Sequence, residues 1–158
     1  MQDQDNLCIE LLNFIDQLDN EIESFNSESN IWKKPDGINN SPGNITLHII
    51  GNLNHWIGAF LLNKGYQRNR PLEFSSEAIP RNELLKMLRQ CKTMIEKELP
   101  AYLIKHKGEQ YPEPFDGKPI SIYGAITHLI AHLAYHCGQV NYFRRMLEGS
   151  QAKVQQTT

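Results

Sequence analysis

Four segments of the chain carry apolar residues with the period of an α-helix, and they predict an all-α fold. The apolar positions of residues 5–26 are three or four apart, so they share one helix face. They are Leu7, Leu11, Phe14, Leu18, Ile22 and Phe25. Residues 43–64 are apolar on almost all sides, which predicts a central, buried helix. Residues 80–106 and 121–148 are the third and fourth predicted helices.

Turn and capping residues mark where the predicted helices begin and end. The cluster 41–44, Ser-Pro-Gly-Asn, precedes the second helix, and Gly65 follows it as a stop. Pro100 is expected to kink or end the third helix. Gly149 is expected to stop the fourth, and residues 150–158 then form a disordered tail.

The connections between the helices are long and contain large aromatic residues. They span residues 27–42, 65–79 and 107–120. Long connections in a compact domain are often functional. Their aromatic residues either line the mouth of a pocket or pack as lids over the ends of the helices. These residues are Trp32, Tyr111 and Phe115. The one β signal is the short run LEFS at 72–75.

The composition is that of a single globular domain, which we place at residues 1–149. The chain has 158 residues, of which 40% are hydrophobic and 22% charged. Such a chain can bury a sizeable core without disulfides. Residues 1–30 contain eight acidic residues and no Lys or Arg, typical of a solvated helix face. The net charge of −2 and the lack of a basic stripe argue against binding to nucleic acid.

Cysteine usage and the amino terminus indicate a cytoplasmic protein. The three cysteines are far apart in the sequence, so a disulfide framework is not expected. The start, MQDQDNLC, has neither the basic residues nor the apolar run of a signal peptide. No apolar run approaches the roughly 18 residues of a membrane span.

Histidines are concentrated in the second and fourth predicted helices, which hold five of the six. His128, His132 and His136 are spaced by four, so their side chains stack on one helix face. A pair of imidazoles at this spacing can bind one metal ion if another element supplies a third ligand. His48 and His55 are the candidates on the second helix. The alternative is that all of them are hydrogen-bonded core residues. Burying several imidazoles without partners costs a few kcal/mol, and a bound metal ion removes that cost, which favours the metal site.

Two stretches resemble the DinB/YfiT-like family of metal-binding four-helix bundles. The first runs from Trp32 through the turn at 41–43 to His48, and the second is the run HLAYHCGQ at 132–139. The resemblance covers nearly the whole chain. It implies an up-down-down-up four-helix bundle that holds one divalent transition metal, nickel or zinc, with His48, His132 and His136. It also implies a homodimer.

The resemblance further implies a chemistry for the site. Some members of the family are thiol-dependent transferases or isomerases that use bacillithiol, mycothiol or glutathione, and many have no established activity. Many have two adjacent histidines followed by Arg-Gly-Gln. Here Tyr135 and Cys137 replace the additional histidine and the arginine. A cation that could anchor an anionic thiol cofactor is therefore missing at position 137.

The family's topology makes the second and fourth helices antiparallel, which separates the remaining polar residues from the ligands. His55 then lies about 10.5 Å along its helix from the ligand there, and His128 about 6 Å from its nearest ligand, on the same side of the metal. We expect both to lie near the site without binding the ion. Asn52 is placed to hydrogen-bond a ligand ring. The alternative is that Asn52, His55 and His128 only satisfy one another's hydrogen bonds in the core. Gln139 either orients a metal-bound water or caps a polar network, and Cys137 is expected to be a structural thiol.

Two functions remain open from the sequence. Three histidine ligands leave a coordination position for water or substrate, which favours a metal-dependent thiol S-transferase or hydrolase acting on a small molecule or thiol cofactor. The sequence identifies no catalytic acid or base. The alternative is a non-catalytic metal-binding stress-response or interaction module. A fourth protein ligand on the metal would favour that alternative.

Overall fold

The computed structural model describes residues 2–115 and 117–154, which form an all-α fold. Within these ranges there are six α-helices, one π-helical segment and no strand; two isolated β-bridges occur in the segment before the last helix. The elements are α1 (Gln2–Glu23), α2 (Glu28–Ile31), α3 (Pro42–Leu53), η1 (Asn54–Ala59), α4 (Arg70–Ser75), α5 (Arg81–Lys105) and α6 (Ile122–Val154).

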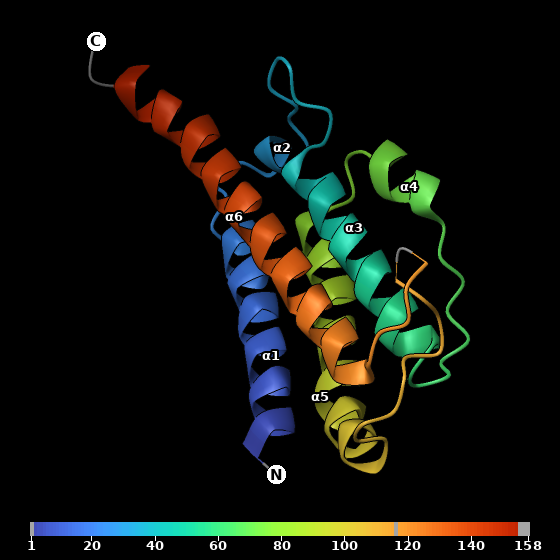
Figure 1. Ribbon diagram of the computed structural model, residues 1–158. Helices are drawn as coiled ribbons and strands as arrows, with labels where there is room; N and C mark the ends of the chain where they lie inside the picture. Colours follow the sequence, from blue (N-terminus) through green and yellow to red (C-terminus); the bar gives the residue numbers. More distant parts are fainter. Residues whose placement is uncertain (1, 116, 155–158) are drawn as a thin grey trace.

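The four long helices α1, α3, α5 and α6 lie side by side (Figure 1). α1 and α6 run in one direction, and α3 and α5 run in the other. α1 packs against α5 and α6, and α3 packs against the same two helices. The two helices richest in histidine, α3 and α6, are therefore antiparallel neighbours.

The core is built from the apolar faces that the sequence pattern predicts. On α1, Leu11, Leu18 and Ile22 are buried as expected, together with Ile15, and Phe25 just after the helix is buried as well. Every residue of α3 is buried, which confirms that this helix is central. None of the described helices combines the length and apolar character needed to cross a membrane.

The helix predicted over 43–64 changes its winding halfway. The α-helical part ends at Leu53 and continues as the π-helix η1. Its wider turns are seen in the amide of Phe60 donating to the carbonyl of His55 at 3.3 Å, and that of Leu62 to Ile57 at 2.9 Å. π-Helical turns are rare and occur frequently at functional sites. Here the change follows directly after the stretch of α3 that contains His48.

The weak β signal at 72–75 does not correspond to a strand, because these residues belong to the short helix α4. The side chain of Asn69 accepts a hydrogen bond from the amide of Leu72, and a proline follows at the start of the helix. Both are N-terminal helix signals. Four apolar and polar residues in a row are too few to separate a strand from a helical turn by periodicity alone.

α5 ends at Lys105, which confirms the predicted end near residue 106, and it passes through Pro100, so Pro100 does not end the helix. Leu99 and Leu103 on either side are fully buried, and their packing holds the last turns in place. α6 continues through Gly149 to Val154, so residues 150–154 of the predicted tail are helical, and 155–158 lie outside the described residues.

The start of α3 is tied to α4 by a buried asparagine. Ser41 and Asn44 form a capping box, which confirms the predicted capping cluster. The Asn44 amide nitrogen also donates to the carbonyls of Glu73 at 3.1 Å and Ser76 at 2.8 Å. One side chain thus caps α3 and positions the helix that carries Glu73.

We expect Asn44→Ala to lower the free energy of unfolding by about 2–4 kcal/mol, because it removes a cap and leaves buried carbonyl groups unpaired. Urea unfolding followed by circular dichroism measures this change. Asn6→Ala, at an exposed position of α1, is the matched control and should change stability by less than about 0.5 kcal/mol. Equal effects of the two substitutions would contradict the role given to Asn44.

Candidate metal centre

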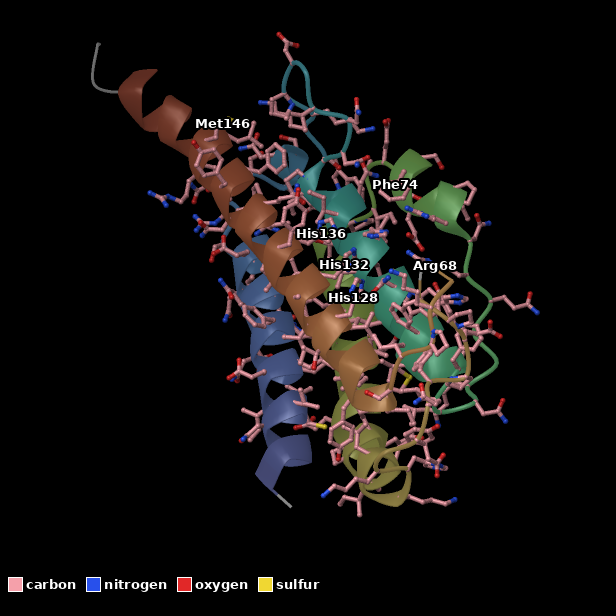
Figure 2. All side chains as sticks on the ribbon, in the orientation of Figure 1. Arg68, Phe74, His128, His132, His136 and Met146 are labelled. Atoms are coloured by element: carbon pink, nitrogen blue, oxygen red, sulfur yellow. The ribbon has the colours of Figure 1, made fainter. Side chains whose placement is uncertain are left out.

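Three histidines from two helices meet between α3 and α6. His48 comes from α3, and His132 and His136 lie one turn apart on α6. Figure 2 shows His128, His132 and His136 following one another along α6. The Nε2 atom of His132 is 3.3 Å from Nε2 of His48 and 3.2 Å from Nε2 of His136. One nitrogen from each ring lies within 4.8 Å of the other two.

These separations match those of ligands on a single ion. Zinc–nitrogen bonds of about 2.0–2.1 Å at tetrahedral angles place two ligand nitrogens about 3.3 Å apart. The three rings also contact one another edge to face, with centroids 4.5 to 5.2 Å apart. His48, His132 and His136 therefore lie close enough to bind one metal ion.

The outer nitrogens of two rings show which tautomer each ring adopts. His48 Nδ1 lies 2.9 Å from Glu73 Oε2 and 3.1 Å from Arg68 Nη2, and His136 Nδ1 lies 2.7 Å from Gln139 Oε1. Because a carboxylate and an amide oxygen accept only, their contacts favour the tautomer with the proton on Nδ1 in both rings. The Nε2 atoms of His48 and His136 consequently present lone pairs to the same point. A cation between them relieves the repulsion of these lone pairs.

Glu73 is the functional residue that sequence reasoning missed. It is a buried carboxylate on α4, and its exposed fraction is 6%. Arg68 donates to it twice, from Nε to Oε1 at 2.6 Å and from Nη2 to Oε2 at 2.8 Å. Burial by itself would raise the pKa of Glu73, but the hydrogen bonds from Arg68 and His48 lower it below its ordinary value. A charged Glu73 behind a ligand imidazole orients the ring and raises its basicity.

A glycine on α3 leaves room for the carboxylate of Glu73. A Cβ atom at Gly51 would lie 2.1 Å from Glu73 Oε1. Only glycine allows Glu73 to approach the helix backbone so closely. The sequence signals available for Glu73 were the capping pattern at 69–71 and a glycine inside an apolar helix, and neither identifies a partner by itself.

Burial keeps the three rings neutral, which is the form that binds metals. Burial above all, followed by the charges of His136 and His48, lowers the pKa of His132 to about 4. Burial also lowers the pKa of His48. Glu73 raises this pKa, whereas the charges of Arg68 and Arg70 lower it further. Burial lowers the pKa of His136 as well. At neutral pH the site needs no proton release from these rings before it binds a cation.

A hollow of about 480 Å³ opens onto the three histidines. Phe74 of α4 and Tyr135 and Phe143 of α6 line it, together with residues 37–40 of the loop before α3. The group of potential ligands contains no fourth described histidine, cysteine or acid. The side of the cluster that faces the hollow is therefore open to a small molecule.

The other predicted site residues on these two helices lie outside the three-histidine group. His55 packs against Trp56 and Phe60, and His128 packs against Phe115. Asn52 is buried, and its Oδ1 has no hydrogen-bond partner among the described residues. The hydrogen bond to a ligand ring expected of Asn52 is instead made by Glu73, because α4 brings a stronger acceptor to His48 Nδ1.

Gln139 forms a hydrogen bond with His136 Nδ1 through Oε1 and donates from Nε2 to the hydroxyl of Tyr135 at 3.1 Å. Of the two roles left open for Gln139, the structure places it in a polar network. Cys137 points away from the hollow and donates from Sγ to the carbonyl of Phe14 at 3.3 Å. Burial raises the pKa of its thiol to about 12, so Cys137 is a structural thiol as expected.

The loop aromatics pack rather than line the hollow. Trp32 donates from Nε1 to the carbonyl of Ile79 at 3.1 Å, and its ring covers Gly43 so closely that a Cβ there would lie 2.7 Å away. It is not among the residues that line the hollow. Tyr111 and Phe115 pack against Trp56 of η1 and against each other in one aromatic group. All three are lid or anchor residues.

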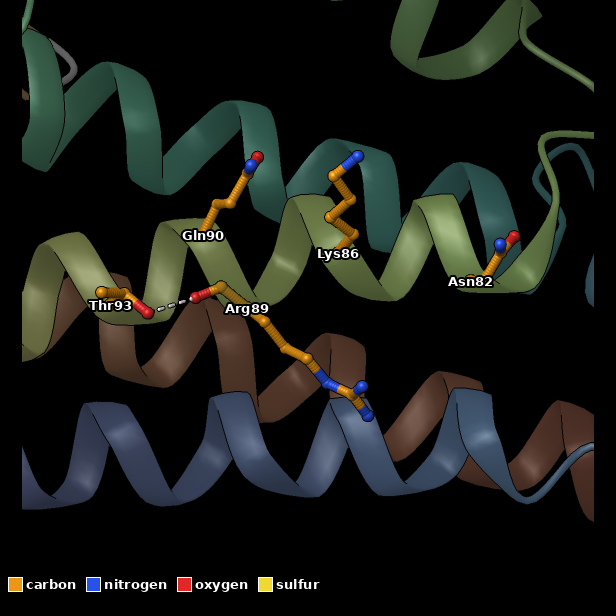
Figure 3. Close-up of a pocket in the computed structure, with 5 residues that line it drawn as sticks. All are labelled: Asn82, Lys86, Arg89, Gln90 and Thr93. Carbon is orange, nitrogen blue, oxygen red and sulfur yellow. Dashed lines mark hydrogen bonds between the residues drawn. The ribbon is translucent and has the colours of Figure 1, made fainter.

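A second hollow of about 480 Å³ lies on the surface of α5 and offers no comparable chemistry (Figure 3). Its lining comes from one helix and consists of Asn82, Lys86, Arg89, Gln90 and Thr93. The Thr93 hydroxyl donates to the carbonyl of Arg89, and the Arg89 guanidinium turns away to Asp19. No group of side chains converges there.

Comparison with known proteins gives one match, to a family model. The model is described as "Protein of unknown function (DUF1572)" and matches residues 6–156. No curated protein and no solved structure matches the chain significantly.

We expect Gly51→Ala to lower the free energy of unfolding by about 1–3 kcal/mol, because the added methyl group forces Glu73 away from α3. Urea unfolding measures the loss, and the nitrogen chemical shifts of His48 report whether Nδ1 keeps its acceptor. Gly138→Ala is the matched control, because a Cβ there meets no atom within 4 Å. The control should be neutral or stabilising by up to about 1 kcal/mol, and equal losses would contradict the close approach of Glu73.

We expect the metal-free protein to lose stability as the pH falls from 6.5 towards 4. The pKa of His132 is about 4 in the folded chain and 6.5 in the unfolded chain, so the unfolded state binds more protons in this window. The pKa of Glu73 is also lowered in the folded chain, so this carboxylate stabilises the fold at neutral pH. That stabilisation is lost as the pH falls through the pKa of Glu73 in the folded chain. Urea titrations in chelator at several pH values measure the slope. His132→Gln should reduce the slope, and an unchanged slope would contradict the burial of this ring.

Proposed function

The chain belongs to the DUF1572 family, within the DinB/YfiT-like clan, and on that premise we propose that His48, His132 and His136 bind one divalent transition-metal ion. The observation that carries the proposal is the convergence of Nε2 atoms 3.2 and 3.3 Å apart, with the outer nitrogens of His48 and His136 already paired. Imidazole suits nickel and zinc alike.

We infer that α1, α3, α5 and α6 constitute the up-down-down-up four-helix bundle of this clan. Their directions and the pairwise packing of α1 and α3 on α5 and α6 support this inference. In such bundles metal sites are formed by side chains of facing helices. α3 and α6 supply the three histidines in that manner.

We further propose that the site is catalytic and serves a metal-dependent thiol S-transferase or hydrolase. A bound divalent ion supplies Lewis acidity to an oxygen or sulfur ligand at the open position, which lowers the pKa of that ligand. The protein's own residues do the rest. Glu73 and Gln139 hold two rings in the binding tautomer, and the hollow beside them admits a small molecule.

We expect each substitution of a ligand to abolish metal binding, whereas the wild-type chain holds roughly one ion per molecule. The substitutions are His48→Ala, His132→Ala and His136→Ala. His55→Ala and His128→Ala are the matched controls on the same two helices, and they should keep most of the metal. Elemental analysis after purification and dialysis measures the content. A wild-type protein that stays metal-free after zinc or nickel is supplied would contradict the proposal.

The same variants test catalysis. Hydrolysis of a chromogenic ester and transfer of a small thiol to an electrophilic acceptor are measured with the metal-loaded protein. Activity that disappears in His136→Ala and persists in His128→Ala supports the enzyme. A fully loaded protein inactive in both assays, with a fourth protein ligand found by X-ray absorption spectroscopy, would favour the non-catalytic alternative, since closed four-ligand sites are typical of structural metals.

A further inference from the structure

The hollow at the three histidines has an arginine at its mouth that the proposed metal site does not use. Arg70 of α4 lines the hollow, and its guanidinium carbon lies 5.9 Å from the centroid of the Phe74 ring. In the part of the chain that the structure describes, no carboxylate or carbonyl group pairs with it. Arg68, two residues earlier in the chain, differs, because two of its nitrogens donate to Glu73.

The positive charge of Arg70 is not balanced within the hollow. Neither aspartate nor glutamate is among the described residues that line it. The nearby carboxylate, Glu73, already accepts from Arg68 at both oxygens and from His48 at one. Arg70 and the three histidines line the same hollow. Three neutral ligands would leave the full charge of a bound ion to add to the charge of Arg70.

Apolar side chains form another part of the lining of the hollow. Ile45, Phe74 and Phe143 face the hollow, and Ile38 of the preceding loop lines it although 41% of its surface is exposed. A volume of about 480 Å³ is in the range of small-molecule pockets. A cationic mouth next to an apolar wall suits a molecule that combines a negative group with a hydrocarbon part.

We propose that this hollow binds a small organic anion, with its carboxylate or phosphate group on Arg70 and its apolar part against Phe74 and Phe143. The planar guanidinium can donate two parallel hydrogen bonds to either kind of anionic group. Arg70 is then a residue that determines specificity. The proposal deepens the proposed function and rests on it in one respect, because the metal ion would add to the attraction.

The test compares three probes that contain six carbon atoms each, namely hexanoate, hexylphosphonate and neutral hexanamide. Isothermal titration calorimetry at low ionic strength measures their binding to the full chain, zinc-loaded and in chelator. We expect at least one anion to bind roughly 10-fold or more tightly than hexanamide, because an ionised partner strengthens hydrogen bonds from the guanidinium. Preference for hexanoate assigns a carboxylate ligand, and preference for hexylphosphonate assigns a phosphate ligand.

Arg70→Gln should remove most of that preference, and Arg70→Lys should retain part of it as a point charge. Arg145→Gln is the matched control, because it removes the same charge from an arginine that lines a different hollow. It should leave the preference unchanged. Equal binding of the anions and hexanamide to the wild-type chain, or equal effects of Arg70→Gln and Arg145→Gln, would overturn the proposal.

The two proposals fail in different ways. Elemental analysis of the same samples reports whether the chain holds metal. A chain without metal refutes the metal site, yet in chelator it still shows whether anion preference depends on Arg70. A chain that holds metal and binds hexanamide as tightly as the anions refutes only the anion proposal.

Discussion

The arrangement of the site depends on one buried carboxylate. Glu73 would be costly to bury alone, and Arg68 and His48 together compensate that cost. Two residues of α3 bring it there. The side chain of Asn44 holds the carbonyl of Glu73 beside the start of α3, and Gly51 leaves space for the carboxylate. In return Glu73 sets the tautomer of His48 and so directs its Nε2 towards α6.

The rest of the site follows from the contact between α3 and α6. Their antiparallel packing brings His48 to a pair of histidines one helical turn apart. Burial keeps these rings neutral, while the hollow leaves one side of the cluster open. The neutral nitrogen lone pairs favour a cation, whereas the uncompensated charge of Arg70 favours an anion. The proposed metal and the proposed anion meet these two opposite electrostatic requirements at different positions.

Much of this was predictable from local patterns. The apolar stripes predicted four long helices and the central position of α3, because the helical period and the degree of burial can be inferred from residues close together in the sequence. The spacing of His132 and His136, with the family resemblance, selected the three histidines that the structure brings together. Short segments were harder. The run at 72–75 is too brief for its period to show, and the π-helical turns of η1 have no apolar signature of their own.

The sequence by itself determined the helices, the capping cluster at the start of α3 and the histidine pair on α6, since each depends on residues within a few positions of one another. Only the tertiary structure decided that Glu73 rather than Asn52 supports His48, and that Arg70 stands free beside the same cluster. Glu73 and His48 are 25 positions apart and join through a short helix held by Asn44. Such a contact depends on how α4 docks on α3, and no local pattern of residues encodes that docking.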